Sequence, residues 1–438
     1  MNLRGYALVT IAYWALTITD GAMRMLVLLH FHALGYGPVT LGFLFVVYEA
    51  CGIATNLLGG RLGRRYGLNR TLHLGLWLQV FALFALSMTE PAWAAPLSIA
   101  WVMGCQGLSG IAKDLTKMSS KSAVKLIVKE ERDGSHRSVL LRLVALLTGS
   151  KNALKGCGFF VGGALLAWIG FAPALLGLAG MLAAVSIVTL LGLGTALPPL
   201  KTRPKAATSA TSATSATSAT SATSWSRSPA VNRLSVARVF LFGARDLWFV
   251  VGLPIFLAEE AGWTVEGIGT FMAIWVIGYG LVQAAAPWLQ SRLSMGDRDT
   301  DETVLARRWM IILILITLGI ASVLLFGDDH LAVPVVVVGL LVFGVAFAVE
   351  SSLHSYLILA FASAEDVAHD VGFYYAANAT GRLFGTLLSG VCFLLGGLST
   401  CLLVSAGFLL VSTLVSWKLP SSRESPVLET PKTTTTEG

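Results

Sequence analysis

The sequence predicts an all-α integral membrane protein with twelve transmembrane helices. Of its 438 residues, 55% are apolar and 13% are charged, against roughly 25% charged residues in a typical soluble domain. Continuous apolar runs of about 20 residues, the length needed to cross the hydrocarbon core, recur along the chain. Strands of a membrane barrel would be shorter and would alternate, so these runs indicate helices. The predicted spans are 6–33, 40–60, 71–89, 96–117, 143–169, 172–195, 234–256, 264–289, 309–326, 331–353, 371–394 and 397–418.

The distribution of Lys and Arg predicts the orientation of these spans. The loops on one side are basic, and the positive-inside rule places them in the cytoplasm. Both termini are therefore predicted to be cytoplasmic, in a multi-pass protein of the cell inner (cytoplasmic) membrane. The net charge of +7 follows from this topology, so no nucleic-acid partner is expected. The loops that contain neither Lys nor Arg follow the odd-numbered spans and are 33–39, 89–95, 170–172, 258–264, 327–330 and 396–400.

No motif in the sequence indicates enzymatic chemistry. It contains no HExxH zinc motif, no phosphate-binding glycine loop and no soluble domain. The five cysteines lie in or at the ends of spans without a CxxC pair, and we interpret them as packing residues. His30 and His32 are two residues apart, so they do not share a helix face. The sequence therefore predicts a protein that is not an enzyme and has no catalytic residues, cofactor or metal site.

The composition changes between the sixth and seventh spans, where Thr-Ser-Ala recurs. Small hydroxyl residues without apolar anchors cannot offset the entropy of ordering, so this linker and the polar tail are expected to be disordered. Six spans, a cytoplasmic tether and six more spans resemble the major facilitator superfamily, whose halves are related by an axis along the membrane normal. The predicted units are a six-helix bundle over 1–196, a linker over 197–232, a second six-helix bundle over 233–419 and a tail over 420–438.

The resemblance to that superfamily extends to two motifs. The loop after the second span reads Gly-Arg-Leu-Gly-Arg-Arg-Tyr-Gly over 60–67 and resembles the superfamily's gating loop. Arg64 stands at the usual acidic position, so another contact must replace the usual carboxylate latch. On the fifth span, 158–163 reads Gly-Phe-Phe-Val-Gly-Gly, which resembles a glycine-rich antiporter motif and predicts close helix packing. The candidate gating residues are Gly60, Arg64, Arg65 and Gly67.

Several charged residues fall inside the predicted spans. Each costs about 2.5–3.5 kcal/mol at the bilayer centre on insertion scales, so each is expected to face a cavity or a partner. Those nearest the midplane are Asp20, Arg24, Glu49, Arg245, Asp246 and Arg382. Those nearer the cytoplasmic face are Lys113, Asp114, Lys117, Lys151, Lys155, Arg238, Glu350 and His354.

Two interpretations of these charges stay open. Arginines on spans one and seven would hold a phosphate-like group between the halves, because each guanidinium can donate two hydrogen bonds to one oxyanion. Alternatively the charges form structural ion pairs: Asp20 and Arg24 can pair at i,i+4, whereas the adjacent Arg245 and Asp246 point apart and need other partners. Spans one, four, seven and ten line the cavity in the superfamily, which implies a transport path with Asp20, Arg24, Lys113, Arg245 and Glu350. The candidates for proton coupling or ion pairing are Asp20, Glu49, Asp246, Glu350 and His354.

Four lysines at a spacing of four, from Lys113 to Lys125, form a stripe on one face of the fourth span. At about 1.5 Å per residue, Lys113 lies about 26 Å and Lys117 about 32 Å from the outer end of that helix. These two lysines therefore reach the inner part of the membrane, and the stripe predicts a funnel for anions from the cytosol.

Six segments of the chain carry a resemblance to a known family. The segments are Thr-Asp-Gly-Ala-Met-Arg at 19–24, Leu-His-Phe-His-Ala-Leu-Gly-Tyr at 29–36, the lysines of 113–125, Thr-Gly-Ser-Lys-Asn-Ala-Leu-Lys-Gly at 148–156, Phe-Gly-Ala-Arg-Asp at 242–246 and Gly-Tyr-Gly-Leu-Val-Gln at 278–283. They resemble the ArsJ family of organoarsenical efflux permeases, and the likeness covers nearly all twelve spans but not the linker or the tail. This resemblance implies alternating-access efflux of 1-arseno-3-phosphoglycerate, which confers arsenate resistance. It also implies functional coupling to glyceraldehyde-3-phosphate dehydrogenase, which makes that product from arsenate.

Such a substrate carries phosphate at one end and an arsenate ester at the other, so it needs two groups of cationic residues, one to bind each end. We expect Arg24 and Arg245 at one end and Lys113, Lys151 or Lys155 at the other. An organophosphate/phosphate or other organic-anion exchanger stays open as the alternative, as does the energy source. We expect a monomer with a small anionic substrate. The candidate substrate-binding residues are Arg24, Lys113, Lys117, Lys151, Asn152, Lys155, Arg245, Asn378 and Arg382, with Asn152 and Asn378 serving the carbonyl and hydroxyl groups.

Overall fold

The computed structural model describes residues 3–55, 68–128, 136–193, 226, 228–293, 301–362 and 367–421. The candidate gating loop with Gly60, Arg64, Arg65 and Gly67 lies outside these residues. So do most of the predicted linker and almost all of the predicted tail. Lys121 and Lys125 lie on the helix Ala95–Val128, and their side chains are not among the described parts of the structure.

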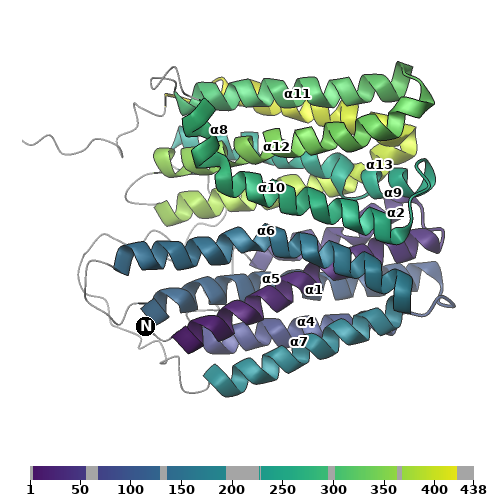
Figure 1. The fold of residues 1–438 in the computed structure, drawn as a ribbon, viewed down its shortest axis with the longest axis vertical. Helices are drawn as coiled ribbons and strands as arrows, with labels where there is room; N and C mark the ends of the chain where they lie inside the picture. Colours follow the sequence, from purple (N-terminus) through teal and green to yellow (C-terminus); the bar gives the residue numbers. More distant parts are fainter. Residues whose placement is uncertain are drawn as a thin grey trace, which may run out of the picture.

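The described residues form two helical bundles that lie side by side, as Figure 1 shows. In the N-terminal bundle, α1 packs against α5, α6 and α7, and α4 packs against α5 and α7. A short helix over 46–55 continues the direction of α2 after a break at Phe45. The labelled helices are α1 (Leu3–Ala33), α2 (Pro38–Leu44), α4 (Leu68–Ser87), α5 (Ala95–Val128), α6 (His136–Ile169) and α7 (Phe171–Leu193).

The C-terminal bundle is built around contacts of α13 with α8 and α11. The α8–α9 stretch is interrupted at Val250 and Val251, and the Ser389 hydroxyl accepts hydrogen bonds from the freed N–H groups of Val251 and Gly252 at 3.3 and 3.2 Å. Such replacement bonds are what a broken helix requires inside a membrane. The helices are α8 (Pro229–Phe249), α9 (Gly252–Glu259), α10 (Val265–Leu293), α11 (Glu302–Phe326), α12 (Asp329–Phe361) and α13 (Val367–Ser416).

Eleven stretches of the described residues are long and apolar enough to cross a membrane. The last one, Phe373–Ser416, is 44 residues long, which exceeds the length of a single crossing. Its backbone leaves the helical conformation at Gly396 and Gly397, where Gly397 has a φ of +64° that favours glycine. This break divides the stretch into two helices. The all-helical membrane fold predicted from the sequence is confirmed.

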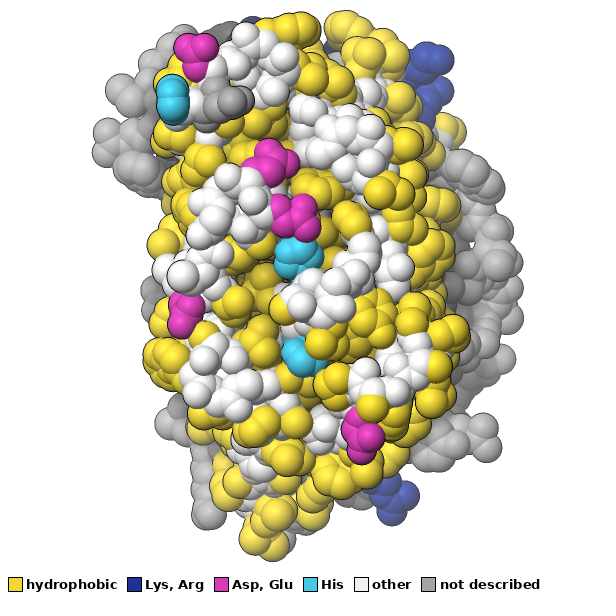
Figure 2. Space-filling model, turned by 90° about the vertical axis from the view of Figure 1, so that its right-hand side faces the viewer, with side chains coloured by type: hydrophobic (Ala, Val, Ile, Leu, Met, Phe, Trp, Pro, Cys, Tyr) yellow, Lys and Arg dark blue, Asp and Glu magenta, His cyan; other side chains and the backbone are white. Residues whose placement is uncertain are grey.

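One end face of the molecule carries few Lys and Arg side chains. Figure 2 shows the end at which α1 finishes, where acidic and histidine side chains are scattered among apolar ones and Lys and Arg appear at the margin. This is the side on which the predicted loops lack Lys and Arg. Large apolar side chains are exposed along the flanks, as with Leu191 and Phe326, which are 79% and 87% exposed. A lipid environment accounts for such flanks.

Glycines allow close contact between helices at the boundary of the bundles. A Cβ at Gly162 on α6 would lie 2.5 Å from the Ala22 carbonyl on α1, within the same bundle. The next residue, Gly163, faces Gly269 on α10 of the other bundle, with 3.2 Å from its ideal Cβ position to the Gly269 Cα. The glycine-rich segment over 158–163 thus serves helix packing, which agrees with its interpretation from sequence.

Candidate functional site

A chain of ion pairs joins the two bundles; we call it the central ion-pair chain and define it as Arg24, Glu49, Arg382, Asp246 and Arg245. Glu49, in the helix over 46–55, accepts a hydrogen bond from Arg24 on α1. Glu49 also accepts from Arg382 Nη2 on α13 at 2.6 Å. Arg382 Nε reaches Asp246 Oδ2 on α8 at 3.2 Å, and Arg245 Nε donates to Asp246 Oδ1 at 2.7 Å. Both carboxylates are buried and each is shared by two arginines.

Two details of the predicted pairing are wrong. Asp20 does not pair with Arg24: it accepts a hydrogen bond from the Tyr48 hydroxyl, while Arg24 extends to Glu49 on the neighbouring helix. Arg245 and Asp246 were expected to point apart, yet they bind each other. Their backbone positions do diverge by about 100° around the helix. The long, flexible arginine stem nevertheless lets its guanidinium fold back along α8.

Two cavities lie beside this chain and share Lys155 and Arg382 in their walls. We name them by the orientation predicted from the sequence. The outer cavity has an empty volume of about 390 Å³, including space open to solvent, and reaches Leu28 in the second half of α1. The inner cavity has an empty volume of about 410 Å³, also including space open to solvent, and reaches Tyr13 in the first half of α1. The outer cavity is lined by Arg24, Met25, Leu28, Phe45, Lys155, Phe159, Arg245, Asp246, Phe249, Val250, Met272 and Arg382. The inner cavity is lined by Tyr13, Thr17, Asp20, Tyr48, Lys113, Lys117, Lys151, Lys155 and Arg382.

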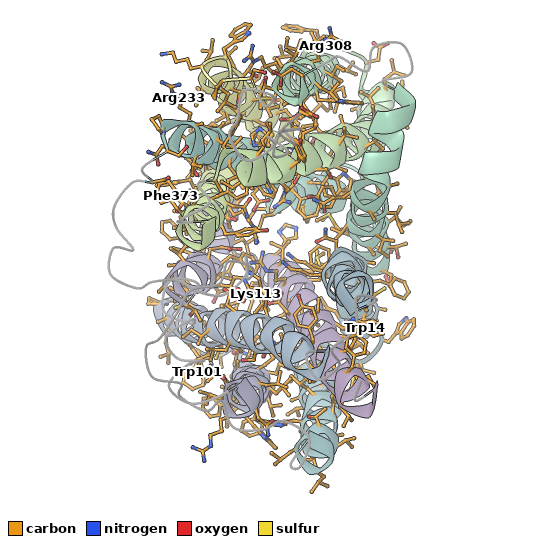
Figure 3. All side chains as sticks on the ribbon, turned by 90° about the vertical axis from the view of Figure 1, so that its left-hand side faces the viewer. Trp14, Trp101, Lys113, Arg233, Arg308 and Phe373 are labelled. Atoms are coloured by element: carbon orange, nitrogen blue, oxygen red, sulfur yellow. The ribbon has the colours of Figure 1, made fainter. Side chains whose placement is uncertain are left out.

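The lysines of the inner cavity differ in their partners. Lys113 and Lys117 lie 4.0 and 3.5 Å from the two oxygens of Asp114, so one buried carboxylate serves both. Lys113 Nζ also lies 4.2 Å from the ring centre of Tyr48. No carboxylate in the described part of the chain is within 4.0 Å of Lys155, whose ammonium lies 5.5 Å from the ring centre of Phe159. Figure 3 places Lys113 where the N-terminal bundle faces the C-terminal bundle.

One donor of the central chain is unused. Arg24 Nε is buried and makes no hydrogen bond with any described group, although the same guanidinium binds Glu49 through Nη2. The Arg24 guanidinium also stacks on Tyr48, 4.2 Å from the ring centre. The Arg24 guanidinium is held in place by a carboxylate and an aromatic ring, and its Nε–H lacks a hydrogen-bond partner among the described residues. Because Arg24 also lines a cavity, its guanidinium is suited to bind an oxyanion.

The structure brings most of the predicted substrate-binding residues together, but two lie elsewhere. Asn152 Nδ2 donates to Gln283 Oε1 on α10 at 2.9 Å, and Asn378 Oδ1 accepts from Arg238 Nε at 3.1 Å. Neither asparagine lines the outer or the inner cavity. The cationic candidates that do line the cavities are Arg24, Lys113, Lys117, Lys151, Lys155, Arg245 and Arg382.

Sequence reasoning did not single out the aromatic residues of the site. Tyr48 contacts Asp20, Arg24 and Lys113, and Tyr13 lines the inner cavity. The position of Tyr48, directly before the charged Glu49 inside an apolar span, is a signal that could have drawn attention to it.

Two helical bundles with charged cavities at their boundary are the arrangement of a membrane transporter of small molecules. A family model described as the Major Facilitator Superfamily matches residues 6–300 and 234–436, and the chain belongs to this family. No curated protein matches the sequence.

Solved structures with the same fold are similar over nearly the whole chain. A bacterial homologue of the iron transporter ferroportin in an inward-facing state is 16% identical, with a TM-score of 0.67 and coverage of 96% of this chain and 99% of that chain. A D-xylose-proton symporter is 14% identical, with a TM-score of 0.68 and coverage of 97% and 99%. A bacterial homologue of the human lysosomal transporter Spinster, inward-facing and occupied, is 12% identical, with a TM-score of 0.69 and coverage of 96% and 97%. At these identities the likeness establishes the fold alone.

Proposed function

We propose that this transporter exports a small organic anion with two anionic groups, and that the anion is 1-arseno-3-phosphoglycerate. The observation that carries the proposal is the pair of adjoining cavities, whose walls hold cations from both bundles. The carboxylates among the lining residues are Asp20 and Asp246, which are fewer than the cations. A surplus of fixed positive charge at the boundary of the bundles favours a multiply charged anion.

The two cavities suit the two ends of such a substrate. Arg24 and Arg245, one from each bundle, line the outer cavity and would hold one oxyanion. Lys113 and Lys151 line the inner cavity and would hold the other. Lys155 lies between them in both walls. For the carbonyl and hydroxyl groups, the donors in the inner cavity are Tyr13, Thr17 and Tyr48, whereas the asparagines considered from sequence are engaged elsewhere.

The central ion-pair chain suggests how binding would drive alternating access. Glu49 binds Arg24 in its own bundle and Arg382 in the other, so it links the two halves. An anion in the outer cavity competes with Glu49 and Asp246 for the same guanidinium groups. Binding would therefore weaken the link between the bundles while the anion itself bridges them, and release would restore it.

The substrate identity rests on the resemblance to the ArsJ family together with this cationic site. That family implies the enzymatic partner, since glyceraldehyde-3-phosphate dehydrogenase would supply the arsenylated product on the cytoplasmic side. Decomposition of the labile product outside would keep its external concentration low. Export in that case needs no further energy source.

Everted membrane vesicles test the proposal directly. Arsenate accumulation in vesicles that contain the protein should require glyceraldehyde-3-phosphate dehydrogenase, its cofactor and glyceraldehyde 3-phosphate. The Arg24→Lys variant should lose this accumulation while still reaching the membrane. The matched control is Arg233→Lys, at an exposed position at the start of α8. Accumulation that does not depend on the dehydrogenase would refute the organoarsenical substrate.

The second candidate is an organophosphate/phosphate exchanger. The same cations favour it, because phosphate and arsenate esters present similar oxyanions to a guanidinium. Vesicles loaded with phosphate distinguish the two functions: an exchanger takes up labelled 3-phosphoglycerate in proportion to the phosphate inside, and an organoarsenical exporter does not.

A further inference from the structure

The aromatic ring of Tyr48 contacts one cation of each cavity. Arg24 lines the outer cavity, and its guanidinium carbon lies 4.2 Å from the centre of the Tyr48 ring. Lys113 lines the inner cavity, and its ammonium lies at the same distance of 4.2 Å from the ring centre. Cations are attracted to the face of an aromatic ring, and more strongly where they are desolvated. One ring therefore contacts a member of each of the two cationic groups that line the cavities.

The Tyr48 ring is held at both ends. The residue is 1% exposed, and its hydroxyl donates a hydrogen bond to the buried carboxylate of Asp20 on α1. A hydrogen bond to a carboxylate is stronger than one between neutral groups. Because Asp20 holds the hydroxyl and the helix over 46–55 holds the Cα, the faces of the ring keep one orientation.

Glycines bring α5 and the helix over 46–55 together beside this ring. A Cβ at Gly110 on α5 would collide with the carbonyl oxygen of Tyr48. Lys113 follows Gly110 by three residues, so both lie on one face of α5. A Cβ at Gly52, one turn beyond Tyr48, would lie 3.8 Å from Lys113 Nζ. The two glycines thus leave the space in which the ammonium of Lys113 lies against the ring.

Arg24 is placed by residues on either side of Tyr48 in the sequence. Its guanidinium carbon lies 5.6 Å from the ring centre of Phe45, and its Nη2 donates to Glu49. Two aromatic rings and a carboxylate therefore confine this guanidinium. A group that is held in one geometry before its ligand arrives loses little further freedom when the ligand binds.

The shared ring limits how far apart the two cations can be. Each lies 4.2 Å from the same ring centre, so the Arg24 guanidinium carbon and the Lys113 ammonium are separated by at most twice that distance. An organic dianion reaches both cations only when its two charged ends have a matching separation. A dianion of another length loses a charge-assisted hydrogen bond at one end. Two cations at a fixed separation therefore select dianions by length.

The carboxylate beside Lys113 does not set this separation. Asp114 Oδ2 lies 4.0 Å from the Lys113 ammonium, and Asp114 Oδ1 lies 3.5 Å from that of Lys117. All three residues belong to α5, so their contacts do not fix a distance to α1. The Tyr48 ring, by contrast, contacts cations on α1 and α5 at once.

We propose that Tyr48 is a positioning residue, which sets the separation of the two cationic groups and so determines the length of the organic dianion that the transporter accepts. The ligand class is a short carbon chain with an oxyanion at each end. The inference rests on the proposed function, because it requires that one anion occupies both cavities. It holds whether the second oxyanion is an arsenate or a phosphate ester.

The experiment measures the binding of dianions of different length to the purified full-length protein by titration calorimetry. The probes are the bisphosphates of ethanediol, propane-1,3-diol and butane-1,4-diol, which place two, three and four carbons between the phosphate esters. Wild-type protein should bind the three-carbon bisphosphate about tenfold more tightly than the other two, which corresponds to one hydrogen bond to a charged group. Inorganic phosphate, which reaches only one cationic group, serves as the reference ligand.

Two variants of Tyr48 and one control test the role of the ring. Tyr48→Leu removes the ring and should reduce the preference for three carbons to about twofold, because no group then contacts both cations. Tyr48→Phe keeps the ring but loses the hydrogen bond to Asp20, so it should show an intermediate preference. The matched control is Tyr279→Leu, a buried tyrosine of α10 that lines neither cavity and should keep the wild-type preference.

The length preference is a readout that a merely structural role of Tyr48 would not move. An unchanged preference in Tyr48→Leu overturns the inference and leaves the proposed function standing, as does a wild type that binds all three lengths equally. A wild type that binds inorganic phosphate but no bisphosphate refutes the proposed function and the inference with it. Should Tyr48→Leu lose inorganic phosphate as well, Tyr48→Phe decides, and a preference equal to that of the wild type then overturns the inference.

Discussion

The two bundles share a fold but use their charged residues differently. The N-terminal bundle directs lysines into the cavities, and Lys155 has no carboxylate within ion-pair distance among the described residues. The C-terminal bundle contributes Arg245 and Arg382, both of which bind Asp246. Its titratable pair on α12, Glu350 and His354, is buried away from the cavities. The difference is that the N-terminal bundle directs Lys155, a cation without a nearby carboxylate in the described part of the chain, into the cavities, whereas the arginines of the C-terminal bundle are paired with Asp246.

The largest effect on stability is expected when the carboxylate that joins the two bundles is removed. Replacing Glu49 by Gln leaves Arg24 and Arg382 without their shared partner in a buried site. Removing one partner of a buried ion pair destabilises a protein by about 3–5 kcal/mol. We expect a marked fall in the thermal unfolding temperature of the purified protein. The control is Glu90→Gln in an exposed loop, and equal stability of the two variants would contradict the role of Glu49 as a link between bundles.

The second prediction tests whether the shape of the arginine side chain, and not only its charge, matters on each side of the boundary between the bundles. Arg24→Lys and Arg245→Lys retain a positive charge but lose the planar fork. A hydrogen bond to a charged group contributes about 1.5–3 kcal/mol, so each variant should weaken anion binding by about tenfold or more and abolish arsenate resistance. Membrane fractions probed for the protein show whether it is still inserted. Wild-type resistance in either variant would remove that arginine from the site.

A third prediction concerns the packing of α6 within the N-terminal bundle. Gly162→Ala places a methyl group 2.5 Å from the Ala22 carbonyl, so the helices must separate. Overpacking of this kind costs about 1–3 kcal/mol. At Gly180 on α7 nothing lies within 4 Å, so Gly180→Ala should be neutral or slightly stabilising. Thermal unfolding of the two variants in the same detergent is the measurement, and equal unfolding temperatures would show that α1 and α6 can move apart freely.

Smaller effects are expected at the lysines of the inner cavity. Lys113 lies over the Tyr48 ring at 4.2 Å, a contact that contributes on the order of 1 kcal/mol. Lys113→Gln should slow anion entry several-fold and reduce the dependence of the transport rate on salt concentration, because a charge on the approach path is lost. Initial rates at low and high salt test this, and an unchanged salt dependence would exclude Lys113 from the approach.

The smallest effect concerns Glu260, at the end of α9 outside the membrane-spanning segments. Burial, together with the neighbouring Glu259, raises the pKa of the Glu260 carboxyl above its ordinary value of 4.5. A raised carboxyl pKa contributes stability below the ordinary value, and this contribution is lost as the pH rises through the folded-state pKa. Glu260→Gln should therefore be slightly more stable than the wild type at neutral pH, with a smaller difference near pH 4. Unfolding temperatures at both pH values provide the check.

Much of the fold follows from the sequence, because hydropathy over about 20 residues reflects the physical thickness of a bilayer. The sidedness of Lys and Arg likewise reflects how loops cross a membrane. On the end face drawn in Figure 2, Lys and Arg appear only at the margin, which agrees with the loops that lack them in the sequence. Breaks within helices were harder to foresee, since the interruption before Gly252 depends on hydrogen bonds from its neighbourhood to Ser389, far along the chain.

The site was predictable as a set of residues but not as a set of pairs. Membrane depth alone identified the arginines and carboxylates near the midplane. The contact between Glu49 and Arg382 joins residues 333 positions apart, and nothing local in the sequence indicates it. The prediction that Arg245 and Asp246 point apart was also wrong. Helix geometry fixes only the direction of the Cα–Cβ bond, and the long arginine side chain can still bring its guanidinium group to the neighbouring carboxylate.

Two adjacent glycines of α6 lack side chains on different sides of the helix. Gly162 packs against α1, and Gly163 packs against α10. At the boundary, Gly163 meets Gly269, so two backbones touch without side chains that interlock. At this contact the helices could slide or tilt without displacing a packed side chain. Elsewhere along the same two helices Asn152 binds Gln283, so the Gly163–Gly269 contact is a local point of backbone packing. We expect a bulky residue introduced at Gly163 to hinder movement of one bundle against the other.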